Sequence, residues 1–498
     1  MKKYIFNRIL RSLVSIFLIT TLIYAIVFTM VPRRLIFKQD STYSKVAADP
    51  DKKINYENTV FEKMGYIQYM PAKELQQKAS KINDSVTVEA NSKNESIYKE
   101  YIKSIGKGWQ LDQMPNSKTF YATREVPIYE RVFNFYANLI QIDHPWKIQD
   151  ETNPDLERYI RIENDPSIGW SVVGSGTKHK YLLYANGSFP FIHQNFVTLD
   201  LGTSYPTFAN IPVLQVISEG QGQKESNDVT FPNGNTTSST VNIYSRTYQS
   251  PSKADSRSKA LYDNDPYSKT LSNYKDPSML EMSARIGLAG VLIAYAIALP
   301  LGSYMSRFKN TIFDRGSTGL LTFLMAIPSI ALIYVVRFVG SSLGLPDVFP
   351  TLGAHNILSY IMPAFILAIL YIPGITLWVR RYLIDLQYSD FVRFARAKGL
   401  SEKEIANKHI FKNAMVPIVA GVPGAILNVI VGATLTETVF AYPGMGKMLI
   451  DSVRAANNSM VVGLAFIFSA LSILALLLGD LSMTILDPRI KLSDKGGK

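Results

Sequence analysis

Cysteine is absent from the sequence, and histidine occurs only five times in 498 residues. The lack of cysteine excludes disulfide bonds, thiolate zinc sites and a cysteine nucleophile. No His-Glu-x-x-His motif is present, so a metalloprotease has no support. A nucleotide-binding P-loop is missing as well. The nearest segment, AYPGMGKM at 441–448, has Ala441 where the first glycine belongs and Met448 where serine or threonine belongs. We therefore predict no cofactor in this chain, and any ATP that it uses must bind to another polypeptide.

The charge balance is basic, with a formal net charge of +12. Such a balance is typical of nucleic-acid binding, but no RNA- or DNA-binding motif accompanies it. Membrane proteins offer another explanation, because they carry excess Lys and Arg in cytoplasmic loops. We therefore expect no nucleic-acid partner.

Six apolar runs are long enough to cross a bilayer. The first, residues 9–31, is longer than a typical signal-peptide core and ends in Pro32-Arg33-Arg34 without a small-x-small cleavage pattern. This favours an uncleaved span over a cleaved signal peptide. The sequence thus predicts an α-helical integral membrane protein with six transmembrane helices. The other five runs are 282–305, 317–340, 358–379, 414–439 and 460–486.

Basic residues alternate between the ends of these runs. They occur before the first run, after the second, after the fourth and in the tail, whereas the loop 341–356 has none. Under the positive-inside rule, both termini are cytoplasmic and residues 35–277 are extracellular. Arg33, Arg34 and Lys38 conflict with this assignment and weaken the signal of the first run.

Residues 35–277 are too many for a connector and predict a folded, mixed α/β extracellular domain between the first and second helices. Residues 71–82 and 97–105 have helical patterns, whereas YLLYANGSF and FVTLDLG, within 181–202, predict strands and turns. From 219 to 276 the chain is rich in Ser, Asn, Thr, Asp and Lys, which predicts long surface loops or partial disorder. The predicted units are 1–34 (N-terminus and first helix), 35–277, 278–487 (five helices with a cytoplasmic loop at 380–413) and the tail 488–498.

A basic, helix-prone segment at 391–418, FVRFARAKGLSEKEIANKHIFKNAMVPI, separates the fourth and fifth apolar runs. Asp390 can cap a helix that continues to Lys398, and Gly399 is the residue type that ends a helix in the left-handed conformation. Ser401 and Glu404 have the spacing of a capping box, so a second helix begins there. We therefore expect two short helices joined by a tight bend. Neither helix has a long apolar stripe, so each needs a partner surface.

Ionisable side chains inside apolar runs are candidate functional residues. Glu437 and Asp480 are the best placed, with Arg285 and Arg337 nearer the ends of their runs. They either line a pore or have structural roles, in which the arginines reach the interface and Asp480 bonds a neighbouring helix. The sequence has no chain of carboxylates of the kind that a proton-driven pump needs.

Four motifs give the chain a family resemblance. ARAKGLSEKEI (395–405) resembles the coupling loop of permease subunits in bacterial ABC importers of the oligopeptide/dipeptide (OppB-like) branch. LGTSY (201–205), TETVFAYPGMGKMLIDSV (436–453) and DPRIK (487–491) resemble three further segments of that branch, and the long external region resembles its streptococcal AmiC-type members. Two departures are present. Ala395-Arg396-Ala397 stands where the general importer loop has Glu-Ala-Ala, and Lys412 stands where the general pattern has proline.

The resemblance implies a type I importer permease of a bacterial plasma membrane, with no enzymatic activity of its own. The implied partners are a second homologous permease, two ATP-binding subunits that hold ATP and Mg, an extracellular peptide-binding lipoprotein, peptide substrates and membrane lipids. The loop would dock in a cleft of an ATP-binding subunit. The implied coupling residues are Arg393, Ala395, Arg396, Ala397, Lys398, Gly399, Leu400, Ser401 and Glu402.

Two alternatives stay open from the sequence. One is an export-side or mechanotransmitting ABC subunit, in which a large external domain also follows the first span but four spans are usual. The other is a membrane-anchored wall enzyme, for which Asp143, His144 and His193 are candidate residues.

Overall fold

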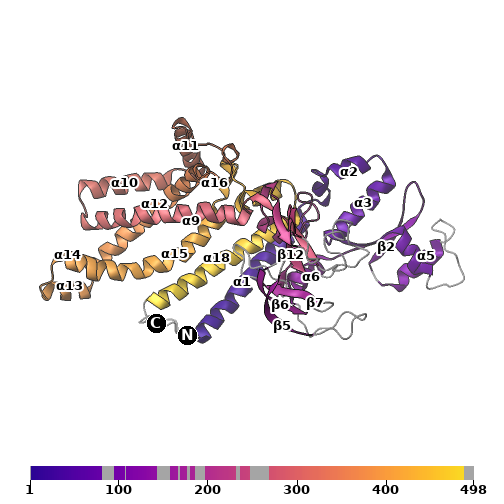
Figure 1. Cartoon of the computed structure of the whole chain (residues 1–498), viewed down its shortest axis with the longest axis horizontal. Coiled ribbons are helices and arrows are strands. Elements are labelled where there is room, and N and C mark those ends of the chain that lie inside the picture. Colours follow the sequence, from indigo (N-terminus) through magenta and orange to yellow (C-terminus); the bar gives the residue numbers. More distant parts are fainter. Residues whose placement is uncertain are drawn as a thin grey trace.

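The computed structural model describes residues 2–80, 95–106, 108–142, 158–165, 169–175, 180–185, 197–230, 236–246 and 268–486. Figure 1 shows a bundle of long helices with a second body of helices and strands at one of its ends. The described residues between 35 and 277 form this second body. We call residues 35–277 the inserted region, because they lie between the first and second long helices.

In the described part of the chain, five helices are long and apolar enough to cross a membrane, or six spans if one bent pair counts as a span. In the bundle α9 packs along α12, while α15 and α1 both pack along α18. Met282, Ile286, Ile366 and Leu367 form part of the buried core between α9 and α12. The five helices are α1 (Lys2–Met30), α9 (Met279–Arg307), α12 (Leu358–Gln387), α15 (Lys412–Gly432) and α18 (Asn458–Leu486).

The third apolar run is not one straight helix. It folds as α10 (Ile312–Ala326) and α11 (Ser329–Ser342), which meet at an angle of 106°. Ile327 is extended, with ψ of 130°, because the following Pro328 disfavours the helical conformation of the residue before it. The run predicted as a span over 317–340 is therefore a bent pair of helices rather than one straight helix.

The fifth apolar run also divides. Its helix α15 ends at Gly432, and a separate short helix, α16 (Thr434–Val439), follows. A further helix, α17 (Met445–Arg454), then leads into α18. The predicted span 414–439 therefore extends past the end of its long helix.

The first half of the inserted region has its own small core. The antiparallel sheet has the order β1-β3-β2, and Leu75, Tyr98, Phe120 and Ala122 are buried beside it. The two predicted helices are present as α4 and α5. The elements are a 3-10 turn (Arg33–Phe37), α2 (Ser41–Val46), α3 (Pro50–Lys63), β1 (Ile67–Met70), α4 (Ala72–Ser80), α5 (Glu95–Ser104), β2 (Trp109–Gln113) and β3 (Phe120–Glu125).

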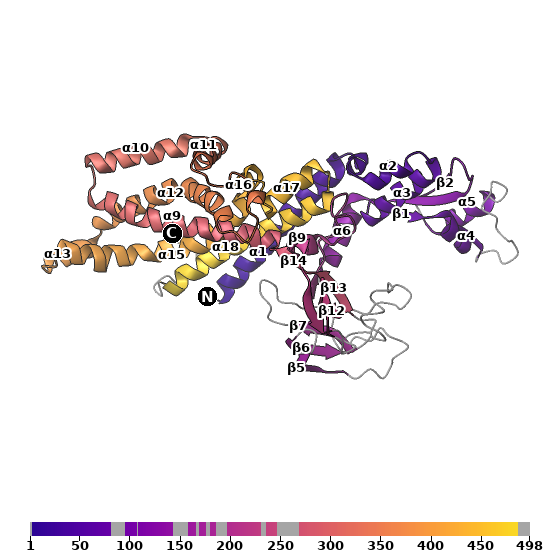
Figure 2. The same cartoon turned by 45° about the horizontal axis from the view of Figure 1, so that its top comes forward.

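The second half contains α6 (Ile128–Leu139), α7 (Val213–Ser218) and mostly paired strands. A sheet of order β5-β6-β7 lies to one side of the molecule, below β12 and β13 in Figure 2. The predicted strands at 181–185 and 197–199 are present, while the Asn-Gly at 186–187 lies outside the described residues. The strands are β4 (Ile140–Ile142), β5 (Ile160–Asp165), β6 (Gly169–Ser175), β7 (Lys180–Ala185), β8 (Val197–Leu199), β9 (Gln221–Lys224), β10 (Asn227–Thr230), β11 (Thr236–Ser239), β12 (Val241–Arg246), β13 (Ser268–Ser272) and β14 (Tyr274–Asp276).

The polar stretch 219–276 was predicted to form long surface loops or partial disorder. Its described residues, 219–230, 236–246 and 268–276, correct that prediction, and the others lie outside the described residues. The described residues form the antiparallel pairs β9–β14, β10–β11 and β12–β13. Threonine, which is frequent here, is β-branched and suits strands even when its neighbours are polar. Composition alone therefore misassigned a segment whose strands satisfy one another's backbone groups.

Side chains from distant parts of the chain join the inserted region to the bundle. Asn457, just before α18, donates from Nδ2 to Ser204 Oγ at 2.8 Å and to Thr207 Oγ1 at 2.9 Å. Its neighbour Asn458 donates to the hydroxyl of Tyr66 at 2.6 Å. The LGTSY segment, which contains Ser204, is thus attached to the start of the last long helix.

Candidate functional site

The basic segment after α12 forms an elbow of two short helices. The first, α13 (Asp390–Ala397), ends at Gly399, whose φ of +79° is left-handed. The Gly399 amide donates to the Arg396 carbonyl at 2.9 Å, and the Leu400 amide donates to the Ala395 carbonyl at 3.3 Å. These two bonds form a Schellman motif, which satisfies carbonyls at the end of the helix. The predicted helix end and its glycine are therefore present.

The second helix of the elbow begins with the predicted capping box. Ser401 Oγ accepts from the Glu404 amide at 3.3 Å, and the Glu404 carboxylate accepts from the Ser401 amide at 3.2 Å. These bonds to Ser401 lower the pKa of Glu404. The helix α14 (Glu402–Glu404) continues through a π-helical turn (Ile405–Phe411) directly into α15.

A salt bridge joins the two arms of the elbow. Arg396 Nε lies 2.7 Å from Glu402 Oε1, and Arg396 Nη2 lies 3.2 Å from Glu402 Oε2. The arginine lowers the pKa of Glu402, and Glu402 raises the pKa of Arg396. Both side chains are exposed, so the pair orients the loop more than it stabilises it.

The inner face of the elbow packs on the bundle. Val392, Ala395 and Ile405 are buried against Val379 of α12 and Ile418 of α15. The elbow is consequently tied at both ends and along one side.

The outer face of the elbow carries Arg393, Phe394, Ala397 and Lys398, all exposed. Phe394 was not among the coupling residues predicted from the sequence. Its side chain is 69% exposed on α13. Its signal in the sequence was a large aromatic residue on the face away from Val392 and Ala395.

Two details of the predicted loop need correction. The residue at the N-cap of α13 is Ser389, whereas Asp390 is already helical and pairs with Arg393 at 3.5 Å. Ala395 is buried within the chain rather than facing a partner. Arg396 forms an exposed salt bridge with Glu402, and its contact with a partner stays a prediction.

Glu437 is fully buried at the other end of the bundle, where it binds the N-terminus of α17. Its Oε1 accepts from Ser283 Oγ at 2.7 Å, and its Oε2 accepts from the Lys447 amide at 2.9 Å. Ser283 Oγ in turn accepts from the Met445 amide at 2.9 Å. The first amides of a helix have no partner within it and attract negative charge, which explains the carboxylate here. We call this cluster the Glu437 latch, because it joins α9, α16 and α17.

The other ionisable residues singled out in the sequence have partners within the chain. Asp480 of α18 pairs with Arg8 of α1 at 3.0 Å. Arg285 binds Glu281 and the Tyr360 hydroxyl, and Arg337 donates to the Val439 carbonyl and to Asp347.

An ion pair that the sequence did not indicate links α10 to α12 near the elbow end of the bundle. Arg380 donates to Asp314 through Nε at 2.5 Å and through Nη2 at 2.7 Å, and Asp314 is only 1% exposed. The Asn310 amide donates to the same carboxylate at 2.9 Å. Removing one partner of such a pair leaves a buried charge without compensation.

We predict that Arg380→Ala destabilises the protein by about 3–5 kcal/mol, because Asp314 stays buried and unpaired. Thermal unfolding of the purified protein measures this loss. The neighbouring exposed Arg381 provides the control, since Arg381→Ala removes the same charge from the surface. Equal melting temperatures for the two variants would contradict the prediction.

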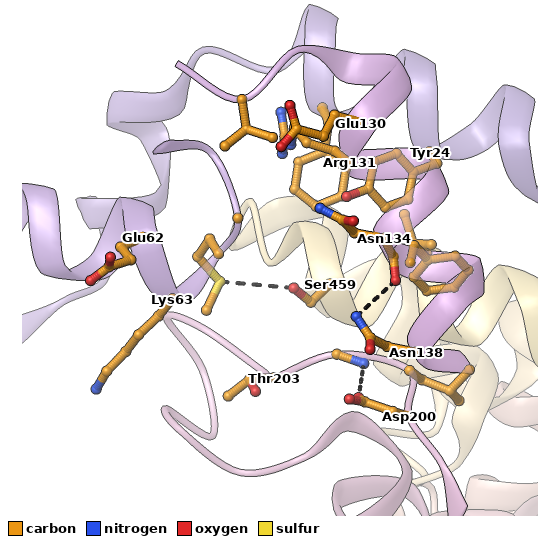
Figure 3. A pocket seen from close by; sticks show the side chains of 18 of the residues that line it. Tyr24, Glu62, Lys63, Glu130, Arg131, Asn134, Asn138, Asp200, Thr203 and Ser459 are labelled. Carbon is orange, nitrogen blue, oxygen red and sulfur yellow. Dashed lines mark hydrogen bonds between the residues drawn. The ribbon is translucent and has the colours of Figure 1, made fainter. Parts of the chain in front are cut away.

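A pocket of 340 Å³ lies where the inserted region meets α1 and α18. Figure 3 shows Glu130, Asn134 and Asn138 of α6 facing Ser459, Asp200 and Thr203 across it. Among the residues that the structure describes, no group of three or more His, Cys, Asp or Glu side chains is placed to hold a metal ion.

The arrangement of long apolar helices around an elbow is that of a membrane permease component. Residues 298–492 match the family model of the binding-protein-dependent transport system inner membrane component. Over its full length the chain is 67% identical to the oligopeptide transport system permease protein AmiC of Streptococcus pneumoniae, covering 100% of both chains. The dipeptide transport system permease protein DppB of Lactococcus lactis is 29% identical over 215 residues, covering 43% of this chain and 70% of that protein. A chain of the inward-facing MetNI methionine ABC transporter gives a TM-score of 0.34 at 15% identity, covering 42% of this chain and 94% of that one.

The chain therefore belongs to the family of oligopeptide transport system permeases. This confirms the resemblance inferred from the four motifs. The protein is a transport-system subunit and not an enzyme, so the wall-enzyme alternative is excluded.

Proposed function

We propose that this chain forms one half of the membrane pore of an ATP-driven oligopeptide importer and receives the motion of the ATPases through its elbow. The cargo is inferred from the relatives that match over the full chain, which are named for oligopeptide transport. The export or mechanotransmission alternative finds no support among them. The observation that carries the coupling role is the elbow itself, a compact bend fixed by backbone bonds and seated on α12 and α15.

The proposed orientation puts the elbow, the N-terminus and the C-terminus in the cytoplasm, and residues 35–277 outside a bacterial plasma membrane. It rests on the alternation of basic loops and on Figure 1, where the elbow lies at the end of the bundle away from the inserted region. In this proposal the bent pair α10–α11 counts as one span, which gives six transmembrane helices in all. Residues 278–487 form the permease core.

The proposed assembly contains a second homologous permease, two ATP-binding subunits that hold ATP and Mg, and an extracellular peptide-binding lipoprotein. The exposed face of the elbow supports docking, because Phe394 offers an apolar anchor and Arg393 and Lys398 surround it with positive charge. Buried aromatic anchors dominate binding energy, whereas charges around them steer orientation. The bend is fixed by Gly399, Leu400, Ser401 and Glu402. Arg396 stabilises it through its salt bridge to Glu402.

We predict that a cysteine at Ala397 or Lys398 forms a cross-link to an ATP-binding subunit when the complete importer is oxidised or treated with a short bifunctional reagent. The native chain has no cysteine, so the introduced thiol is unique in this subunit. The control is a cysteine at Gly344, in the loop at the end of α11, which is exposed. Cross-linking from 344 instead of 397 and 398 would refute the assigned docking face. Peptide-stimulated ATP hydrolysis by the purified complex tests the transport function itself.

A further inference from the structure

The helix α6 of the inserted region has two chemically different faces. Glu130, Asn134 and Asn138 recur every four residues and line the pocket in Figure 3. Tyr129 directly precedes Glu130, and Phe133 directly precedes Asn134. The side chains of Tyr129 and Phe133 are 74% and 71% exposed. At 3.6 residues per turn these two sets occupy different sides of the helix. Asn134 and Asn138 are themselves exposed beside the apolar side, and among the described residues nothing covers the side chains of Tyr129 and Phe133.

The arginine of this helix is turned inward and enclosed. Arg131 is 5% exposed, and its guanidinium lies 4.3 Å from the ring centroids of both Phe28 and Tyr66. Such contacts attract a cation to aromatic faces. The enclosure keeps this charge away from the exposed side of α6, as a surface beside lipid requires.

The depth of α6 is set by its contacts with α1, whose span covers Phe6–Met30. The Tyr136 hydroxyl lies 3.0 Å from the Phe17 carbonyl and 3.0 Å from Thr21 Oγ1. Phe17 lies well inside this span, roughly 20 Å from Met30 at 1.5 Å per residue. Arg131 lies near Phe28 and Tyr136 near Phe17, so α6 runs antiparallel to α1, along its outer half.

The apolar stripe continues beyond the helix. Ile140 and Ile142 of β4 are exposed, and Ile142 pairs with Val197 of β8, which is exposed as well. On the side of α1, the Tyr136 ring lies tilted against the Phe17 ring at a centroid distance of 4.7 Å. Phe17 belongs to the exposed apolar face of α1, with Leu18 and Leu22 nearby. The stripe is therefore continuous with the surface that a membrane span turns toward lipid.

We propose that α6 and the β4–β8 pair are immersed in the leaflet next to the inserted region, with Tyr129, Phe133 and Ile142 facing lipid. Lipid is favoured over a protein partner because the stripe is continuous with the exposed apolar face of α1, and its polar groups are only the Tyr129 hydroxyl and the Tyr136 hydroxyl, which is bonded to α1. Tyrosine is enriched where a membrane meets water, which suits Tyr129 at the shallower end. The inserted region is then held against the bilayer at two places, through α1 and through this face.

The test uses nitroxide labels on single cysteines in the complete importer reconstituted in lipid vesicles. The labelled positions are 129, 133 and 142. Leu18→Cys on α1 provides the lipid reference, and Lys99→Cys on α5 provides the water reference. Oxygen concentrates in hydrocarbon and a nickel chelate stays in water, so the ratio of their collision rates reports depth. Peptide uptake by each variant is measured separately, which keeps a loss of transport distinct from a change in depth.

We expect the ratios at 133 and 142 to match that at 18 and to exceed that at 99 several-fold, with a lower ratio at 129 than at 133. A ratio at 133 equal to that at 99 would place the face in water and overturn the proposal. Low collision rates with both reagents would show that protein covers the face, which also overturns it. Position 142 repeats the test on a separate element if the 133 variant fails to assemble.

Discussion

Gly399→Pro abolishes peptide import while the protein still reaches the membrane. The amide of Gly399 donates to the Arg396 carbonyl, and its φ of +79° is outside the range of proline. The substitution therefore breaks the Schellman motif and redirects the second arm of the elbow. The long helices do not depend on this bend, so abundance in the membrane stays close to normal. Uptake of a labelled peptide, with membrane abundance measured in parallel, checks the result.

A graded series at the same position separates backbone strain from steric clash. A Cβ added at Gly399 meets nothing within 4 Å, so Gly399→Ala introduces only the strain of a left-handed residue, about 1–2 kcal/mol. Asparagine tolerates this conformation better than alanine. Uptake should thus fall in the order glycine, asparagine, alanine, proline.

Gly344 provides a matched control for that series. It ends α11 with φ of +82°, and the Leu345 amide donates to the Gly340 carbonyl as Leu400 does to Ala395. A Cβ at Gly344 also meets nothing within 4 Å. Gly344→Ala carries the same strain away from the elbow and should leave uptake nearly unchanged. Normal uptake by abundant Gly399→Pro would refute the coupling role.

The elbow could be predicted because its determinants are local. Gly399, Ser401 and Glu404 act on backbone groups within a few residues, so their types and spacing sufficed. The bend at Pro328 had an equally local signal, but the length of the apolar run outweighed it. What the sequence missed was the inward direction of Ala395, which depends on where α12 and α15 lie.

Long-range polar pairs could not be predicted from the sequence. Asp314 and Arg380 are 66 positions apart, and Ser283 and Glu437 are 154 apart. In the sequence each of these residues is an isolated charge or hydroxyl, because its partner becomes a neighbour only in the folded structure. The segment AYPGMGKM looked like a failed phosphate loop for the same reason. Its glycines accommodate the carboxylate of Glu437 instead of a nucleotide.

The Glu437 latch carries the second large prediction, which is that Glu437→Ala prevents stable accumulation of the protein. The substitution removes the acceptor for the buried Ser283 hydroxyl and for the half-buried Lys447 amide. A buried donor left without a partner costs about 1–3 kcal/mol. Glu437→Gln should be intermediate, because its amide oxygen can replace one carboxylate oxygen but its NH₂ group cannot accept a hydrogen bond. Thermal unfolding in detergent and membrane abundance measure the order.

Gly444→Ala tests the same latch from the opposite side. A Cβ at Gly444 would lie 2.4 Å from the carboxyl carbon of Glu437, so either the carboxylate or the start of α17 must move. The backbone of Gly444, with φ of −103° and ψ of 175°, suits any residue, so the whole loss comes from that clash. Gly424→Ala in α15 is the control, because its Cβ would meet nothing within 4 Å. If the 444 and 424 variants unfold at the same temperature, the carboxylate is not held as the latch requires.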